Sequence, residues 1–113
     1  MKHAWEGLVY ALISQSNFRV HLFVSIVVVG MGILLKISMG EWITVAMTVT
    51  LGLVVELINT SIEEAVDLVT QEYNLFAKRA KDTAAAAMMI YAVGAAILGG
   101  LIFLPKIWIY IWG

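Results

Sequence analysis

The chain has 113 residues, of which 62% are hydrophobic and 13% are charged. Soluble domains carry about 25% charged residues, so this composition argues against a soluble globular domain and indicates a membrane protein. The net charge of −1 provides no basic surface, so no nucleic-acid partner is expected. Because the chain has no cysteine, disulfides, thiolate metal sites and cysteine nucleophiles are excluded.

The first segment, residues 2–16, places apolar side chains on one side of a helix, with Lys2 and Glu6 elsewhere on its circumference. This pattern predicts an amphipathic helix that lies in the membrane interface, where Trp5 and Tyr10 suit the depth of the lipid headgroups. The alternative is a short helix that packs on the rest of the bundle.

Three later segments are apolar and long enough to cross a bilayer. They are residues 20–38, 42–63 and 83–104. The sequence therefore predicts an all-α membrane protein of one domain, in which an interfacial helix precedes three transmembrane helices. A bundle this small has little interior of its own, so we expect it to form an oligomer.

Local signals predict where these spans begin and end. Residues 39–41 predict a short turn between the first two spans, and Pro105 is expected to end the third. Asp82, which Thr83 and a long helical run follow, predicts an N-cap for the third span. The connection 64–82 is the only strongly polar stretch of the chain.

The distribution of basic residues predicts the orientation in the membrane. The N-terminal segment and the connection between the second and third spans carry Lys2, Arg19, Lys78, Arg79 and Lys81. Cytoplasmic loops are enriched in Lys and Arg. We therefore expect a multi-pass protein of the cell membrane, with its N terminus and this polar connection in the cytoplasm.

A polar stripe runs along the second span and just beyond it. It consists of Glu56, Asn59, Glu63 and Asp67. At 100° per residue these positions fall within an arc of roughly 80° on one helix face. A charged side chain near the bilayer core costs at least ~2.5 kcal/mol, so the carboxylates require a bound cation, a neighbouring subunit or protonation. The alternative is a purely structural pairing with basic residues of other helices, and for Glu64 a solvated role is expected.

The stripe has the dimensions of a phosphoryl-transfer site. Glu56 and Glu63 are separated by ~10 Å along the helix axis, about the length that a metal ion, a phosphate and a hydroxyl span together. Glu63 is closer to water and is placed to hold metal and phosphate, whereas Glu56 is placed to meet a hydroxyl at the membrane surface. Asn59 lies between them and can orient either carboxylate. Lys81 can neutralise phosphate charge, although the topology signal alone could explain the basic residues around it.

Several motifs carry a resemblance to a known family. They are E-x-x-N-x-x-x-E-x-x-x-D from Glu56 to Asp67, Glu72-Tyr73, Ala80-Lys81-Asp82, Asn17-Phe18-Arg19-Val20-His21 and Ile102-Phe103-Leu104-Pro105-Lys106. Together they extend over nearly the whole chain, which closely resembles the prokaryotic diacylglycerol kinase and undecaprenol kinase family. The first and last motifs along the chain look more like Gram-positive undecaprenol kinases than the enterobacterial diacylglycerol kinase.

The resemblance implies a homotrimer with composite sites at subunit interfaces on the cytoplasmic face, and ATP with Mg²⁺ as the phosphoryl donor. It implies that Glu56 is the general base, that Asn59 is a neighbouring active-site residue, and that Glu63 binds the metal ion and ATP. The other implied contacts are Glu72, Tyr73, Asn74, Lys81 and Asp82 with ATP, and Asn17, Phe18 and Arg19, in the segment that ends at His21, with the lipid.

Two positions bear on how closely the family pattern is followed. Gln15 stands where many relatives have a glutamate that joins the metal and nucleotide site. Its carbonyl oxygen can still contact Mg²⁺, but the site then has one negative charge fewer. His3 lies roughly where an aromatic contact with ATP is expected.

The stripe and the family resemblance together predict a lipid kinase that transfers the γ-phosphoryl group of MgATP to a membrane lipid alcohol, and the choice of acceptor follows from the resemblance alone. Undecaprenol is the first choice of acceptor and diacylglycerol the second. Two other kinds of function would use the same residues, a non-enzymatic proton or cation carrier and a structural scaffold. The kinase is favoured because the acidic residues gather at one end of the membrane, and because a scaffold gives no reason for the placement of Lys81 and Asp82.

Overall fold

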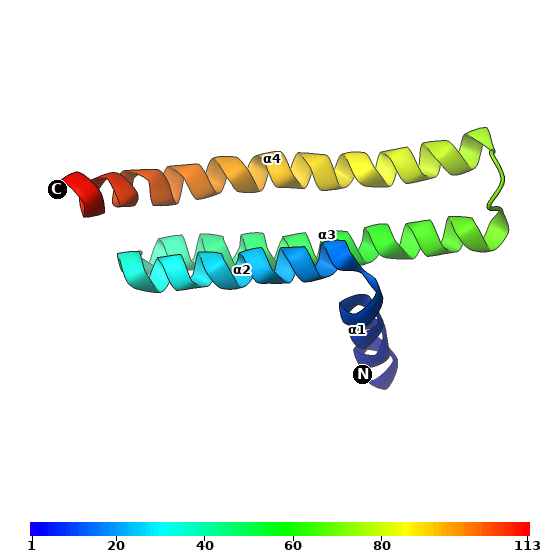
Figure 1. The fold of residues 1–113 in the computed structure, drawn as a ribbon, viewed down its shortest axis with the longest axis horizontal. Coiled ribbons are helices and arrows are strands. Elements are labelled where there is room, and N and C mark those ends of the chain that lie inside the picture. Colours follow the sequence, from blue (N-terminus) through cyan, green and yellow to red (C-terminus); the bar gives the residue numbers. More distant parts are fainter.

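The computed structural model describes residues 1–113 as four α-helices without a strand (Figure 1). The helices are α1 (Lys2–Ser14), α2 (Ser16–Leu35), α3 (Met39–Val69) and α4 (Leu75–Trp112). The last three are long and apolar enough to cross a membrane. The predicted all-α class with three spanning helices is therefore confirmed, and the helices extend beyond the predicted spans at most of their ends.

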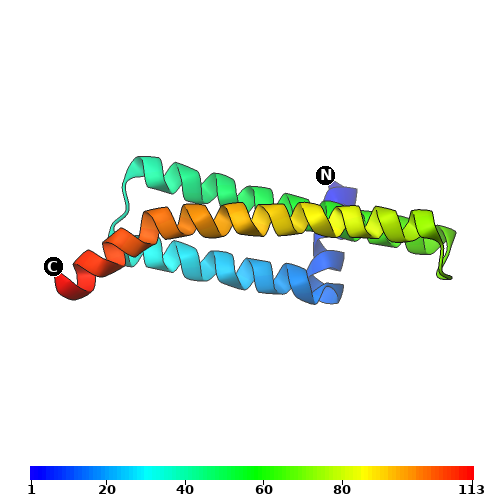
Figure 2. The ribbon, with the colours of Figure 1, turned by 90° about the horizontal axis from the view of Figure 1, so that it is seen from above.

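The long antiparallel hairpin of α3 and α4 is the frame of the molecule (Figure 1). An ion pair joins the two helices near each end: Glu41 to Lys106 at 3.1 Å, and Asp67 to Lys81 at 2.6 Å. Helix α2 packs along one half of the hairpin, and α1 turns away from the bundle (Figures 1 and 2). The other half of the hairpin, which ends in the loop 70–74, projects beyond α2 (Figure 2).

A bend at Gln15 separates α1 from α2. Gln15 has an extended backbone, with φ −108° and ψ 106°, so it ends one helix and begins the next. The guanidinium of Arg19 stabilises this bend, because its Nη1 atom donates to the carbonyl oxygens of Leu12 at 3.0 Å and Ile13 at 2.8 Å. These are carbonyls that the end of α1 leaves without helical partners.

The turn between α2 and α3 lies earlier than predicted. Lys36 adopts the left-handed conformation with φ 54° and ends α2. Ser38 then begins α3 through a capping box, in which its hydroxyl accepts from the Glu41 backbone and the Glu41 carboxylate accepts from the Ser38 backbone. The prediction of a turn at residues 39–41 is therefore wrong, since these local contacts make them the first turn of α3.

Helix α4 starts earlier and ends later than predicted. Asn74 is its N-cap, because its side-chain oxygen accepts from the backbone of Phe76 at 2.9 Å and Ala77 at 3.2 Å. The predicted N-cap at Asp82 is wrong, because that residue lies inside the helix. Pro105 also lies inside α4 and does not end it. Figure 2 shows α4 bend toward its C-terminal end, as expected where proline removes one helical hydrogen bond.

Few side chains are buried within a single chain. Only 10 of the 113 residues are buried, and the main apolar cluster is built on Ile37, Val45 and Phe103 near one end of the bundle. Most large apolar side chains point outward. This is the inverse of a soluble protein and matches a bundle that lipid or further copies of the chain surround.

Candidate active site

The polar stripe lies on α3, in the half of the hairpin toward the loop 70–74. Glu56 is buried, with 3% of its surface exposed, whereas Glu63 is exposed. The Asn59 amide nitrogen donates to the Glu63 carboxylate at 3.1 Å. The structure therefore brings Asn59 and Glu63 into direct contact and leaves Glu56 about two helical turns deeper along the same face.

Lys81 of α4 faces the outer part of the stripe. Its ammonium group contacts the Asp67 carboxylate at 2.6 Å. Lys81 precedes the apolar run of α4. The hydrogen bond from its ammonium group to Asp67 raises the pKa of Lys81, and the negative charges of Asp67 and Glu63 raise it further. Glu63 and Lys81 are thus close enough to influence each other, and Lys81 stays cationic, as a phosphate contact requires.

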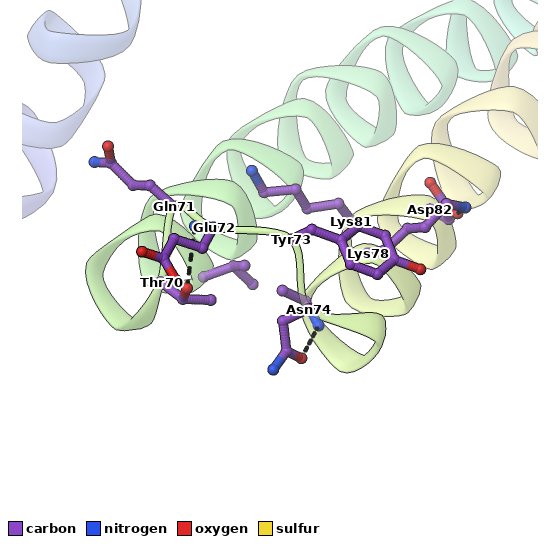
Figure 3. A pocket seen from close by; sticks show the side chains of 10 residues that line it. Thr70, Gln71, Glu72, Tyr73, Asn74, Lys78, Lys81 and Asp82 are labelled. Atoms are coloured by element: carbon purple, nitrogen blue, oxygen red, sulfur yellow. Dashed lines mark hydrogen bonds and ion pairs between the residues drawn. The ribbon is translucent and has the colours of Figure 1, made fainter.

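A pocket of about 250 Å³ opens where the hairpin turns (Figure 3). Figure 3 shows Thr70, Gln71 and Glu72 on one side of it and Lys78, Lys81 and Asp82 of α4 on the other, with Tyr73 extending toward the α4 side. The pocket is lined by Val66, Thr70, Gln71, Glu72, Tyr73, Asn74, Ala77, Lys78, Lys81 and Asp82. Five of the residues for which the family resemblance implies an ATP contact therefore lie around one opening: Glu72, Tyr73, Asn74, Lys81 and Asp82.

Lys78 belongs to the same basic segment as Lys81, for which phosphate neutralisation and a topology signal were both open, and it also lines this pocket. Its ammonium group pairs with the Asp82 carboxylate at 2.5 Å, so two lysines, each bound to a carboxylate, border the opening. The spacing of Lys78 and Asp82 four residues apart in a helix was the signal that could have revealed this pair. The pocket of one chain is smaller than the ~300–1,000 Å³ typical of sites for small molecules.

The donor set of the stripe suits a hard divalent cation. No group of three or more His, Cys, Asp or Glu side chains gathers in the chain to hold a metal ion. However, the side-chain oxygen of Asn59 is buried without a hydrogen-bond partner, next to the Glu63 carboxylate. One carboxylate and one neutral oxygen are compatible with Mg²⁺, which is commonly held by one or two carboxylates together with substrate phosphates.

The remaining residues of the predicted site lie near the bend between α1 and α2. Gln15 is half-buried at the bend, and its amide nitrogen lies 3.5 Å from the Ser14 hydroxyl. Asn17 is exposed, Phe18 is 2% exposed and packs within the chain, and Arg19 caps α1. No hydrogen bond or ion pair joins these four residues to Glu63 or Lys81, so their contacts with metal, nucleotide and lipid stay predictions.

A hydrogen bond joins α1 to the outer part of α3. The Tyr10 hydroxyl donates to the Glu64 carboxylate at 2.6 Å. The expectation of a solvated role for Glu64 missed this contact, because a pairing over 54 residues leaves no local pattern in the sequence. The contact holds α1 beside the polar half of the hairpin. His3, nearer the start of α1, is exposed.

Comparison with known proteins decides the family. The sequence profile described as "Prokaryotic diacylglycerol kinase" matches residues 2–103. The chain belongs to this family. The family resemblance drawn from the motifs is therefore confirmed.

Individual relatives have two kinds of name. The chain is 40% identical to a diacylglycerol kinase of Synechocystis over 107 aligned residues. These residues cover 94% of this chain and 61% of that protein. It is 38% identical over 105 residues to the undecaprenol kinase of Bacillus subtilis, which covers 93% of this chain and 85% of the relative. It is 33% identical over 103 residues to the diacylglycerol kinase of Escherichia coli K12, covering 84% and 78% of the two chains. The chain thus spans less than two thirds of the Synechocystis relative. The names of these relatives refer to two lipids, diacylglycerol and undecaprenol.

Proposed function

We propose that this chain is a membrane lipid kinase that transfers the γ-phosphoryl group of ATP to the hydroxyl of a lipid alcohol. Relatives of both names match most of the chain, so undecaprenol and diacylglycerol are the two candidate acceptors. Undecaprenol is the first choice because the first and last motifs along the chain look more like those of Gram-positive undecaprenol kinases. The observation that carries the proposal is the continuity between the stripe on α3 and the pocket at the hairpin turn. Lys81 lines that pocket and contacts Asp67 of the stripe.

In the proposed mechanism Glu56 accepts the proton of the lipid hydroxyl as the oxygen attacks the γ-phosphorus. The bond from the γ-phosphorus to the bridging oxygen breaks, and ADP leaves. Glu63 and Asn59 would hold Mg²⁺, with Gln15 as a further neutral ligand. When bound, this ion would neutralise charge on the phosphates. Lys81 supplies positive charge on the phosphate side, so catalysis consists mainly of positioning and charge stabilisation.

The proposed assembly is a homotrimer in the cell membrane, with its sites at subunit interfaces on the cytoplasmic side. Two features support it. A single chain buries only 10 residues, and its pocket is smaller than is typical of sites for small molecules. A neighbouring copy could supply the missing walls, and the basic residues around the pocket favour the cytoplasmic side.

The test is phosphoryl transfer by purified protein in micelles, with labelled ATP and either undecaprenol or diacylglycerol at matched concentrations. Glu56→Gln should lower kcat by about 10²- to 10⁴-fold, the range for loss of a general base, while ATP binding and oligomeric state stay unchanged. Glu6→Gln is the control, because this exposed carboxylate of α1 lies outside the stripe. Normal turnover by Glu56→Gln would remove Glu56 from the base role.

The same preparation separates the kinase from an ion carrier. A proton or cation carrier would conduct ions in liposomes and show no lipid-dependent consumption of ATP. The structure offers no second observation in favour of the carrier, since the carboxylates of α3 between Glu56 and Asp67 occupy one half of that helix.

A further inference from the structure

His21 of α2 and Tyr91 of α4 meet against α3 at Gly52. Their ring centroids lie 5.6 Å apart, with an angle of 37° between the ring planes. The Tyr91 hydroxyl donates to the Thr48 carbonyl oxygen at 2.7 Å, which fixes the tyrosine. A Cβ atom at Gly52 would overlap the Tyr91 hydroxyl and lie 2.8 Å from Cε1 of His21. The missing side chain at Gly52 therefore lets both rings rest directly on the backbone of α3.

Glu56 follows Gly52 by one helical turn and lies on the same face of α3. Side chains in an α-helix lean toward its N terminus and cover the preceding turn. The Glu56 carboxylate is therefore directed toward the turn on which the His21 imidazole rests. The imidazole is near enough to act on the carboxylate, and the other ionisable group that acts on Glu56 is Glu63, farther along the stripe.

We infer that His21 is a positioning residue for Glu56 and that Tyr91 holds the imidazole in place. The inference rests on the proposed kinase function, in which Glu56 is the base. A buried carboxylate on a helix can adopt several rotamers, and only some of them meet a substrate hydroxyl. An imidazole fixed beside the carboxylate restricts these rotamers, as outer residues do around other reactive groups.

The surroundings of His21 allow a chemical test. His21 lines a mostly apolar groove of about 450 Å³ between α2, α3 and α4, along with Tyr91 and Thr48. Removing the imidazole leaves a space that opens into this groove. A free imidazole molecule is small enough to occupy it.

The experiment is rescue of His21→Ala, in the full-length protein, by added imidazole. We expect kcat for lipid phosphorylation to fall about 10- to 100-fold while KM for MgATP stays within about twofold, the pattern of a residue that supports the reacting group. Imidazole should restore most of the lost kcat in His21→Ala and none in Glu56→Gln. Tyr91→Leu should also lower kcat, and the control Tyr110→Leu should not, because Tyr110 is 68% exposed in the C-terminal tail.

A kcat of His21→Ala close to that of the wild type would overturn the inference, and so would a loss that imidazole does not restore. If His21→Ala does not fold, Tyr91→Leu decides, since an unchanged kcat in that variant contradicts the role of the ring pair. Failure of the proposed function itself is distinct, because the wild-type protein would then phosphorylate neither lipid.

Discussion

Replacement of Asn59 by leucine tests whether the stripe holds a divalent cation. The change keeps a side chain of similar size and removes two polar atoms. One is the amide nitrogen, which donates to Glu63 at 3.1 Å, and the other is the buried oxygen without a partner. A hydrogen bond to a ligating carboxylate orients it toward the metal ion, and loss of such a partner typically lowers metal affinity by about 10- to 100-fold. Because Glu63 is exposed, the lower end of this range, roughly tenfold, applies.

We therefore expect the Mg²⁺ concentration that gives half-maximal lipid phosphorylation to rise at least about tenfold in Asn59→Leu. The assay is the initial rate at fixed ATP over a Mg²⁺ titration, together with the shift of Tm that Mg²⁺ and ATP produce. Ser61→Ala is the matched control, since its exposed hydroxyl bonds only to the Leu57 carbonyl of the same helix. An unchanged Mg²⁺ dependence in Asn59→Leu, or an equal loss in Ser61→Ala, would refute this assignment of the metal site.

Three further predictions concern the frame around the site. Gly32→Ala should lower the free energy of unfolding by about 1–3 kcal/mol, the usual cost of overpacking, because the added Cβ would lie 2.8 Å from the Trp42 ring. The measurement is Tm in detergent. The control is Gly30→Ala, which should not lower Tm, because no atom lies within 4 Å of the added Cβ. The pKa of Glu41 is lowered, chiefly by the Ser38 backbone N–H and further by Lys106. Its contribution is therefore present above the ordinary glutamate pKa of about 4.3 and is lost as the pH falls through the lowered pKa, so the Tm difference between wild type and Glu41→Gln should be largest near neutral pH and vanish in acid. A difference that grew in acid would contradict this. Tyr10→Phe should speed amide hydrogen exchange in α1 by roughly 2- to 10-fold, because its bond to Glu64 contributes about 0.5–1.5 kcal/mol, and unchanged exchange would show that the bond does not hold α1.

Patterns with a short period predicted the class and the main elements. The apolar runs predicted three spanning helices, and the 100° spacing placed Glu56, Asn59 and Glu63 on one face, where Asn59 and Glu63 now make contact. Such patterns are readable because a helix repeats every 3.6 residues regardless of its neighbours. The polar residues of α3 also indicated the family, because ionisable side chains in an apolar span are costly and usually have a function.

Helix ends were predicted less well, because each depends on a competition between nearby residues. Asn74 and Asp82 are both residue types that can cap a helix N terminus. Asn74 comes first along the chain and caps α4, so Asp82 lies within the helix. Pro105 removes a single hydrogen bond, and the apolar residues after it still favour a helix in the membrane, so α4 bends and continues.

Long-range pairs could not be predicted from one sequence. The contacts of Tyr10 with Glu64 and of Tyr91 with Thr48 join residues 54 and 43 positions apart. Their partners follow from how α1 and α4 pack on α3, and no local spacing encodes that packing. The pocket at the hairpin turn was also not predictable from local spacing, because its walls come from α3, the loop 70–74 and α4. The polar connection had been predicted over residues 64–82, whereas the helices continue to Val69 and resume at Leu75.

The hairpin explains how a chain with so small a core could keep a reactive site in register. Ion pairs near both ends, Glu41 with Lys106 and Asp67 with Lys81, favour one register of α3 against α4. Between these points the distance from the proposed base Glu56 to the pocket is set by the helical rise of α3, not by a flexible loop. Sites built on regular helices hold geometry more closely than sites on loops. Shortening α3 by one full turn between Glu56 and Glu63 should therefore abolish phosphoryl transfer, even though the stripe keeps its face. The same deletion in the exposed C-terminal end of α4, residues 109–112, lies outside both ion pairs and should retain activity. Loss of activity in both deletions with intact folding would contradict the proposal.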